Sequence, residues 1–176
     1  TESSEGGMKY FITGAVASSC FLMGGVLIYG MSGTLDLSAA AFTLKTQGLA
    51  LDPLVLVGAA LLLMGFLFKV SAVPFHQWTP DAYEASPHPI AGFMSVATKG
   101  VALVALLRIF AGNLAPLGAV GVKMQAVVAV LAMATLVLGN LTALVQSNVK
   151  RMLAYSSIAH AGYLLLGLVA GTPAAY

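Results

Sequence analysis

Three side chains that can bind and release a proton lie inside long apolar stretches of the sequence: Lys69, Lys99 and His160. Lys99 and His160 each fall about ten residues into their stretch. At roughly 1.5 Å of rise per residue this is ~15 Å, near the middle of a ~30 Å hydrocarbon layer. A lysine at the centre of a membrane helix costs about 2.5–3.5 kcal/mol on insertion scales. Because such a cost must be offset, we interpret the three residues as candidate proton-transfer groups.

Lysine suits this role because its protonation can be tuned by its surroundings. Burial disfavours the ammonium form and lowers the pKa of a lysine by up to several units, whereas a nearby carboxylate raises the pKa again. Histidine titrates near neutral pH without help. A lysine held between those limits can load and release a proton as its partner moves.

Pro74 follows Lys69 by five residues and predicts a break in the helix that contains the lysine. A proline inside a helix removes the hydrogen bond to the carbonyl group four residues earlier, here that of Val70. Broken helices occur at membrane depth where they line a polar cavity, and they form ion sites in transporters. We therefore predict free carbonyl groups beside Lys69.

Each candidate also has a purely structural interpretation. Lys69 could extend its ammonium group to the membrane surface if its helix ended at Ala72. Lys99 could form a fixed ion pair between helices, and His160 could be a hydrogen-bonded packing residue. The six carboxylates are predicted in loops or at the ends of spans: Glu2, Glu5, Asp36, Asp52, Asp81 and Glu84. We therefore expect a carboxylate partner for the lysines to come from elsewhere in a longer chain or from a neighbouring subunit.

The composition indicates that lipid, not water, surrounds much of the chain. Apolar residues make up 59% and charged residues 8% of the 176 residues, and the mean hydropathy is +0.94. A soluble domain carries about 25% charged residues. The net charge of +2 is small and the basic residues are scattered, so we expect no nucleic-acid partner. A single cysteine, Cys20, and no phosphate-loop, zinc-protease or dinucleotide motif leave no predicted metal or cofactor site.

Five stretches are long and apolar enough to cross a membrane as helices: residues 8–30, 53–78 with a break near 70–74, 90–110, 122–145 and 152–170. Residues 34–50 are too short and too mixed to span, and we predict a loop there with a short interfacial helix. The polar residues that follow Pro74 predict a connection to the third span. Small residues such as Gly24, Gly58 and Gly65 favour close helix packing. We predict an all-α, polytopic helix bundle with one discontinuous helix, as a single membrane domain over residues 1–176.

Two blocks of the sequence resemble signatures of one protein family. The block from Phe68 to Glu84, FKVSAVPFHQWTPDAYE, resembles the broken-helix motif of the antiporter-like subunits of respiratory complex I, in the form of the N subunit (mitochondrial subunit 2). The block from Asn148 to Tyr163, NVKRMLAYSSIAHAGY, resembles a second signature, which the sister L and M subunits and multisubunit cation/proton antiporters share. The opening EGGMKYF at residues 5–11 resembles the start of the sixth helix of the N subunit.

The resemblance implies an inverted-repeat, antiporter-like fold of about fourteen helices, of which this chain would cover roughly helices six to ten. Lys69 matches the family's lysine on broken helix seven, Lys99 the connecting lysine on helix eight, and His160 a polar residue toward the second half-channel. The family's glutamate on helix five would precede Thr1, and its lysine on helix twelve would follow Tyr176. We therefore expect residues 1–176 to be a fragment of a longer chain.

The resemblance also implies a function. It indicates a proton-translocating membrane subunit of NADH:quinone oxidoreductase, which couples quinone reduction elsewhere in the complex to proton movement. NADH, FMN, iron–sulfur clusters and quinone would be bound by other subunits and none by this chain. The expected partners are the M and small K- and J-type membrane subunits and the lipid of a bacterial inner (plasma) membrane or mitochondrial inner membrane. The alternatives are a subunit of a multisubunit Na⁺/H⁺ antiporter and a structural membrane scaffold.

Overall fold

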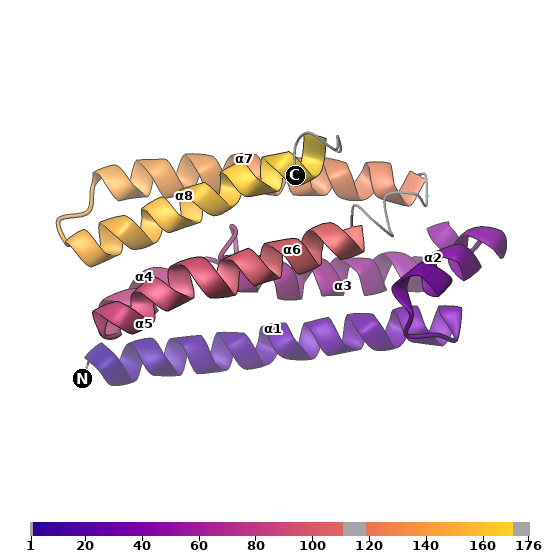
Figure 1. The fold of residues 1–176 in the computed structure, drawn as a ribbon, viewed down its shortest axis with the longest axis horizontal. Helices are drawn as coiled ribbons and strands as arrows, with labels where there is room; N and C mark the ends of the chain where they lie inside the picture. Colours follow the sequence, from indigo (N-terminus) through magenta and orange to yellow (C-terminus); the bar gives the residue numbers. More distant parts are fainter. Residues whose placement is uncertain (1, 111–118, 171–176) are drawn as a thin grey trace.

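In the computed structural model the described residues are 2–110 and 119–170, and every regular element within them is helical. The long helices run side by side along one axis, as Figure 1 shows. The elements are α1 (Glu2–Ser32), α2 (Leu37–Thr46), η1 (Leu49–Leu51), α3 (Pro53–Val70), α4 (Trp78–Ala85), α5 (His88–Phe93), η2 (Met94–Thr98), α6 (Lys99–Ile109), α7 (Ala119–Leu144) and α8 (Val149–Ala170). The predicted all-α fold is confirmed.

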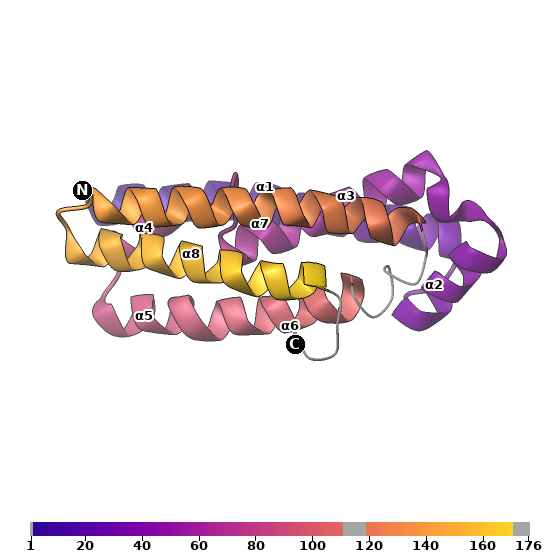
Figure 2. The ribbon, with the colours of Figure 1, turned by 90° about the horizontal axis from the view of Figure 1, so that it is seen from above.

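The described residues contain five candidate membrane spans: Ser3–Ser32, Pro53–Val70, His88–Ile109, Met124–Leu144 and Val149–Ala170. These lie within a few residues of the stretches predicted from hydropathy. Between the first two spans, α2 forms the predicted short helix in the 34–50 segment. It lies at the far end of the bundle from the N-terminus (Figure 2).

Local sequence signals explain where several helices start. Asp52 precedes α3, and its side chain accepts a hydrogen bond of 2.8 Å from the backbone N–H of Leu54. Pro53 follows as the first helical residue, where a missing N–H group costs no hydrogen bond. Asp36 caps α2 in the same way, accepting a bond of 2.7 Å from the N–H of Ala39.

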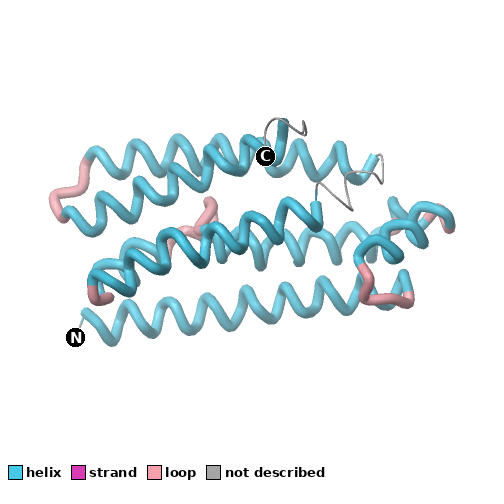
Figure 3. Tube along the Cα trace, viewed as in Figure 1, coloured by secondary structure: helices cyan, strands magenta, loops and turns pink. Residues whose placement is uncertain are grey.

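The second span is broken, as Pro74 predicts, but the break is bounded differently from the prediction. α3 ends at Val70, Ser71 takes a left-handed conformation with φ of 63°, and a helix resumes as α4 at Trp78. Figure 3 shows the irregular segment between the two helices. The prediction of a polar connection after Pro74 is wrong for Trp78–Ala85, because Pro80 lies in the first turn of a helix, where proline is tolerated.

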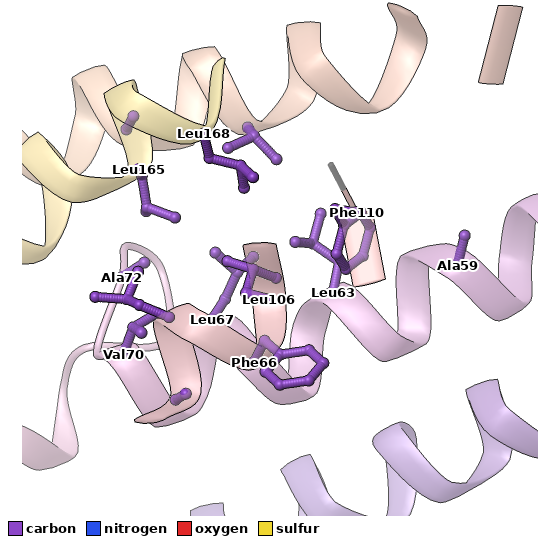
Figure 4. Packing of buried hydrophobic residues seen from close by; sticks show 14 of the residues in the cluster. Ala59, Leu63, Phe66, Leu67, Val70, Ala72, Leu106, Phe110, Leu165 and Leu168 are labelled. Atoms are coloured by element: carbon purple, nitrogen blue, oxygen red, sulfur yellow. The ribbon is translucent and has the colours of Figure 1, made fainter. Parts of the chain in front are cut away.

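α3 is the central helix of the bundle. In its apolar window 56% of the residues are buried, against 11% for α1 and 22% for the span that contains α6. Leu63 and Leu67 of α3 share the main hydrophobic cluster with Leu106 of α6 and Leu165 of α8 (Figure 4). The outer helices therefore keep broad apolar faces that only lipid or neighbouring protein could cover.

Glycines allow the closest helix contacts, as the small-residue pattern predicts. A Cβ atom on Gly24 of α1 would lie 2.7 Å from the carbonyl oxygen of Gly58 on α3, and one on Gly65 would lie 2.6 Å from Cβ of Phe21. A Cβ atom on Gly139 of α7 would lie 2.8 Å from the backbone nitrogen of Ala159 on α8. The pairs α1–α3 and α7–α8 are therefore packed almost backbone to backbone.

Candidate proton-transfer site

Lys99 lies at the midpoint of the span His88–Ile109 and is only 5% exposed. Its Nζ atom donates a hydrogen bond of 2.8 Å to Oγ of Ser157 on α8. The same Nζ atom lies 5.7 Å from the ring centroid of Tyr83 on α4. Side chains of three helices, α4, α6 and α8, therefore meet at this ammonium group.

A π-helical turn immediately precedes Lys99. The turn, η2, covers Met94–Thr98, and α6 begins at Lys99 itself. A π turn inserts an extra residue into the helix and so rotates the residues that follow it, and such turns are frequent at functional sites. The wide turn therefore contributes to the direction in which Lys99 faces.

His160 shares a groove with Lys99. The groove has a volume of about 560 Å³ and lies between α6 and α8, with Ser95, Lys99, Ser157 and His160 among its lining residues. His160 is exposed, and its Nδ1 atom lies 2.7 Å from the carbonyl oxygen of Ser156. Because one water occupies about 30 Å³ in the liquid, the groove has room for a hydrogen-bonded chain of several waters.

Lys69 does not line that groove. It lies in the last turn of α3, its side chain is exposed, and its Nζ atom is 5.9 Å from the ring centroid of Phe68. Within the part of the chain that the structure describes, neither Lys69 nor Lys99 forms an ion pair with a carboxylate. The structure therefore brings together two of the three predicted proton-transfer residues and leaves the third at the helix break.

Hydrogen bonds satisfy several backbone groups at the break. The indole N–H of Trp78 donates to the carbonyl oxygen of Phe68 at 3.2 Å, directly beside Lys69. The hydroxyl groups of Ser71 and Thr79, both fully buried, are 2.7 Å apart. The prediction of free carbonyl groups beside Lys69 is therefore wrong for Phe68, because a side chain of α4 returns to bind it.

α7 also holds the break in place. The backbone N–H of Val73 donates a hydrogen bond of 3.0 Å to the hydroxyl oxygen of Thr135, which is fully buried. The same hydroxyl donates to the carbonyl oxygen of Leu131 at 2.6 Å. Thr135 therefore connects the segment around Pro74 to a helix more than sixty residues later in the chain.

An ion-pair cluster ties α1, α4 and α8 together at one end of the bundle. One guanidinium nitrogen of Arg151 lies 2.8 Å from oxygens of both Asp81 and Glu84, and Nζ of Lys9 lies 2.7 Å from the other oxygen of Asp81. Burial would raise the pKa of Asp81, but hydrogen bonds from Lys9 and Arg151 outweigh burial and hold it below its usual value. Both carboxylates of α4 therefore form their ion pairs within this cluster and not with Lys99.

Sequence reasoning missed two residues next to Lys99. Ser157 lies three residues before His160 on α8, so helical periodicity places both on one face and could have identified it. Tyr83 was missed because its segment was predicted to be a loop. Its side chain is 4% exposed, and its hydroxyl lies near Ser157 but has no hydrogen-bond partner among the described residues.

Together the five candidate spans and the broken helix define a polytopic helical membrane protein with one discontinuous helix. The chain belongs to the NADH:quinone oxidoreductase/Mrp antiporter transmembrane family, whose model matches residues 1–176. This assignment agrees with the resemblance found in the two sequence blocks.

The curated relatives are subunits of one enzyme complex. The chain is 50% identical over 168 residues to NADH-quinone oxidoreductase subunit N of Moorella thermoacetica, covering 96% of this chain and 34% of the relative. It is 51% identical over 169 residues to subunit N of Rubrobacter xylanophilus, with the same coverage of 96% and 34%. The chain therefore spans about a third of the length of these relatives, and the resemblance to the N subunit is confirmed.

Solved structures share the fold. A chain of the membrane-bound sulfane sulfur reductase, an archaeal respiratory membrane complex, is 38% identical with a TM-score of 0.85, over 95% of this chain and 33% of that one. A chain of respiratory complex I from Thermus thermophilus is 40% identical with a TM-score of 0.77, and the match covers 96% of this chain and 34% of that one. A chain of the Mrp complex from Dietzia sp. is 26% identical with a TM-score of 0.78, and the match covers 94% of this chain and 29% of that one. The predicted antiporter-like fold is thus confirmed.

Proposed function

We propose that this chain is one stretch of a longer antiporter-like N subunit of NADH:quinone oxidoreductase, and that the whole protein moves protons across the membrane. The observation that supports this most directly is Lys99. It is a buried lysine at the midpoint of a candidate membrane span, hydrogen-bonded to a hydroxyl group and open to a groove that contains a histidine. A chain with this site that is half identical to subunit N is best explained as a proton-conducting part of that subunit.

The three candidate residues have distinct roles in this proposal. Lys69, beside the helix break at Pro74, is the switchable site, because its exposed side chain can be reached by a carboxylate from another helix of the longer protein. Lys99 is the relay toward the centre of the membrane. His160 is a further relay, which exchanges protons with Lys99 through water in the shared groove. The proton path thus runs sideways between helices before it leaves the membrane.

The proposal places the redox chemistry elsewhere. NADH, FMN, iron–sulfur clusters and quinone are bound by other subunits of the complex, and quinone reduction there drives proton movement here. Partners are the M subunit and the small K- and J-type membrane subunits, in a bacterial inner membrane. Among the described residues no group of three His, Cys, Asp or Glu side chains is placed to hold a metal ion.

Two other functions use the same residues. A subunit of a multisubunit Na⁺/H⁺ antiporter would need no NADH-linked partner, but the Mrp chain is only 26% identical, compared with 50% for subunit N. A structural scaffold would hold its lysines in fixed ion pairs. No such pair of Lys69 or Lys99 is present in residues 2–110 and 119–170.

Co-purification separates the redox-linked function from the antiporter. The full-length protein, tagged in its host and extracted in mild detergent, is expected to bring down NADH:quinone reductase activity and iron–sulfur signals in electron paramagnetic resonance. Purification of a stable assembly that exchanges Na⁺ for H⁺ and lacks both would overturn the proposal. The same tag on an unrelated membrane protein of the host is the control for carry-over.

A further inference from the structure

The hydroxyl group of Tyr83 is the starting observation. Tyr83 is 96% enclosed by the protein, and its Oη atom has no hydrogen-bond partner within the described residues. Its ring packs edge to face against Trp78, with centroids 6.3 Å apart, which holds the phenol in position. A buried hydroxyl without a partner is costly, so a small side-chain rotation that gives it a partner is favoured.

The partner within reach is Ser157. The Tyr83 hydroxyl lies close to the Ser157 side chain, and Oγ of Ser157 already accepts a hydrogen bond of 2.8 Å from Nζ of Lys99. A serine hydroxyl has one hydrogen to donate and two lone pairs, so it can bind a donor on one side and an acceptor on the other. Lys99, Ser157 and Tyr83 therefore stand in a row in which the middle group can reverse its direction.

Few other charged or titratable groups face Lys99. From α4 the neighbour is Tyr83, since Asp81 and Glu84 are bound to Arg151. From α8 it is His160, across the groove. From α3 the one charged residue is Lys69, which does not line that groove. The hydroxyl row is thus the main polar contact of the Lys99 side chain in the described structure.

We propose that Ser157 and Tyr83 form a reversible hydrogen-bond chain that positions the Lys99 side chain in both of its protonation states. When Lys99 is an ammonium group, its N–H donates to Ser157, and the Ser157 hydroxyl donates to Oη of Tyr83. When Lys99 is a neutral amine, the Tyr83 hydroxyl donates to Ser157, and the Ser157 hydroxyl donates to Nζ. The two hydroxyl groups rotate and keep their own hydrogens.

This inference rests on the proposed proton relay. The proton that leaves Lys99 passes to water in the groove and from that water to His160, so Ser157 and Tyr83 act as positioning residues. Hydrogen bonds from an ionised donor are roughly twice as strong as neutral ones, and a chain strengthens each of its members. The row therefore favours the ammonium form of Lys99, and its loss should make Lys99 release its proton at lower pH.

The test is the pH profile of proton pumping by the complete complex in liposomes, with the variants in the full-length protein. We expect Ser157→Ala to move the alkaline limb of the profile to lower pH by about one unit, since it removes a bond to a charged group. Tyr83→Phe keeps the ring and is expected to move the alkaline limb of the profile to lower pH by about half a pH unit. Ser157→Thr retains the hydroxyl and should restore the wild-type profile.

Matched controls are available on α1. Ser19→Ala removes a hydroxyl that donates to the carbonyl of Ala15 on its own helix, and Tyr29→Phe removes an exposed phenol. Both should leave the profile unchanged. Should Ser157→Ala fail to assemble, Tyr83→Phe decides the question alone.

Wild-type profiles for Ser157→Ala and Tyr83→Phe would overturn the proposal. The Lys99→Met complex, measured in the same experiment, shows whether the hydroxyl chain alone or also the proton relay through Lys99 is wrong. Loss of pumping in Lys99→Met would leave the proton relay standing and remove only the hydroxyl chain. Normal pumping in Lys99→Met would remove the relay as well.

Discussion

Replacement of Lys99 with Met is expected to lower proton pumping by the reconstituted complex at least tenfold, while the complex still assembles. Methionine fills about the same volume as the lysine stem, so the packing between α6, α4 and α8 should survive. It cannot bind a proton, and proton transfer by a positioned side chain typically contributes about 10²–10⁴ in rate. The measurement is the proton gradient formed in liposomes by NADH oxidation, with assembly checked on a native gel.

A lysine outside the spans provides the control for Lys99. Lys45 lies in the last turn of α2, and its side chain is exposed. Lys45→Met removes the same charge and should leave pumping unchanged. If Lys99→Met pumped as well as Lys45→Met, the buried lysine would be a structural residue and the scaffold interpretation would gain support.

Replacement of Arg151 with Met is expected to weaken the assembled protein more than the loss of any exposed charge. Arg151 is the common partner of Asp81 and Glu84, and its side chain is 32% exposed. We expect a loss of about 1–3 kcal/mol in stability, between the values for exposed and buried ion pairs. Thermal unfolding of the detergent-solubilised complex measures this loss. Arg151→Lys keeps the positive charge but lacks the planar guanidinium group that can bind two carboxylates. Its unfolding temperature should therefore lie between those of the wild type and Arg151→Met.

The effect of Arg151→Met should depend on pH. Because the folded state holds the pKa of Asp81 below its usual value, this carboxylate stabilises the fold fully above about pH 4, and the contribution is lost as the pH falls through the lowered pKa. The difference in unfolding temperature between wild type and Arg151→Met should therefore shrink on acidification. A difference that stays constant down to the acid limit of the wild-type protein would exclude Asp81 as the relevant partner.

The spans can be predicted from hydropathy to within a few residues of the candidate spans in the structure, and the place of Lys99 within its span can be predicted from residue counting. Both follow from the local sequence, because a membrane helix needs a set number of apolar residues at a fixed rise. That Lys99 and His160 share a groove could not be predicted, since depth says nothing about which faces of two helices meet. The neighbour that Lys99 contacts directly, Ser157, is fifty-eight residues away in the chain.

The region after Pro74 was predicted least well, for physical reasons. Its prolines and polar residues are typical of loops, but Pro80 lies in a first turn and Asp81 and Glu84 are paired with Arg151 across to α8. Tertiary contacts of this kind override local propensity. The buried hydrogen bond from Val73 to Thr135 is a contact of the same type, and no local pattern could reveal it.

The most direct test of the proton path concerns Lys69, which is exposed at the helix break and lies outside the groove of Lys99. The measurement is proton pumping and NADH:quinone reductase activity of the complex that contains Lys69→Ala, after a native gel has shown normal assembly. We predict that both activities fall strongly, because a coupled proton site limits the redox reaction that drives it. Normal assembly with unchanged pumping would contradict this prediction. Lys69 would then be a packing residue, or a lysine whose ammonium group extends to the membrane surface.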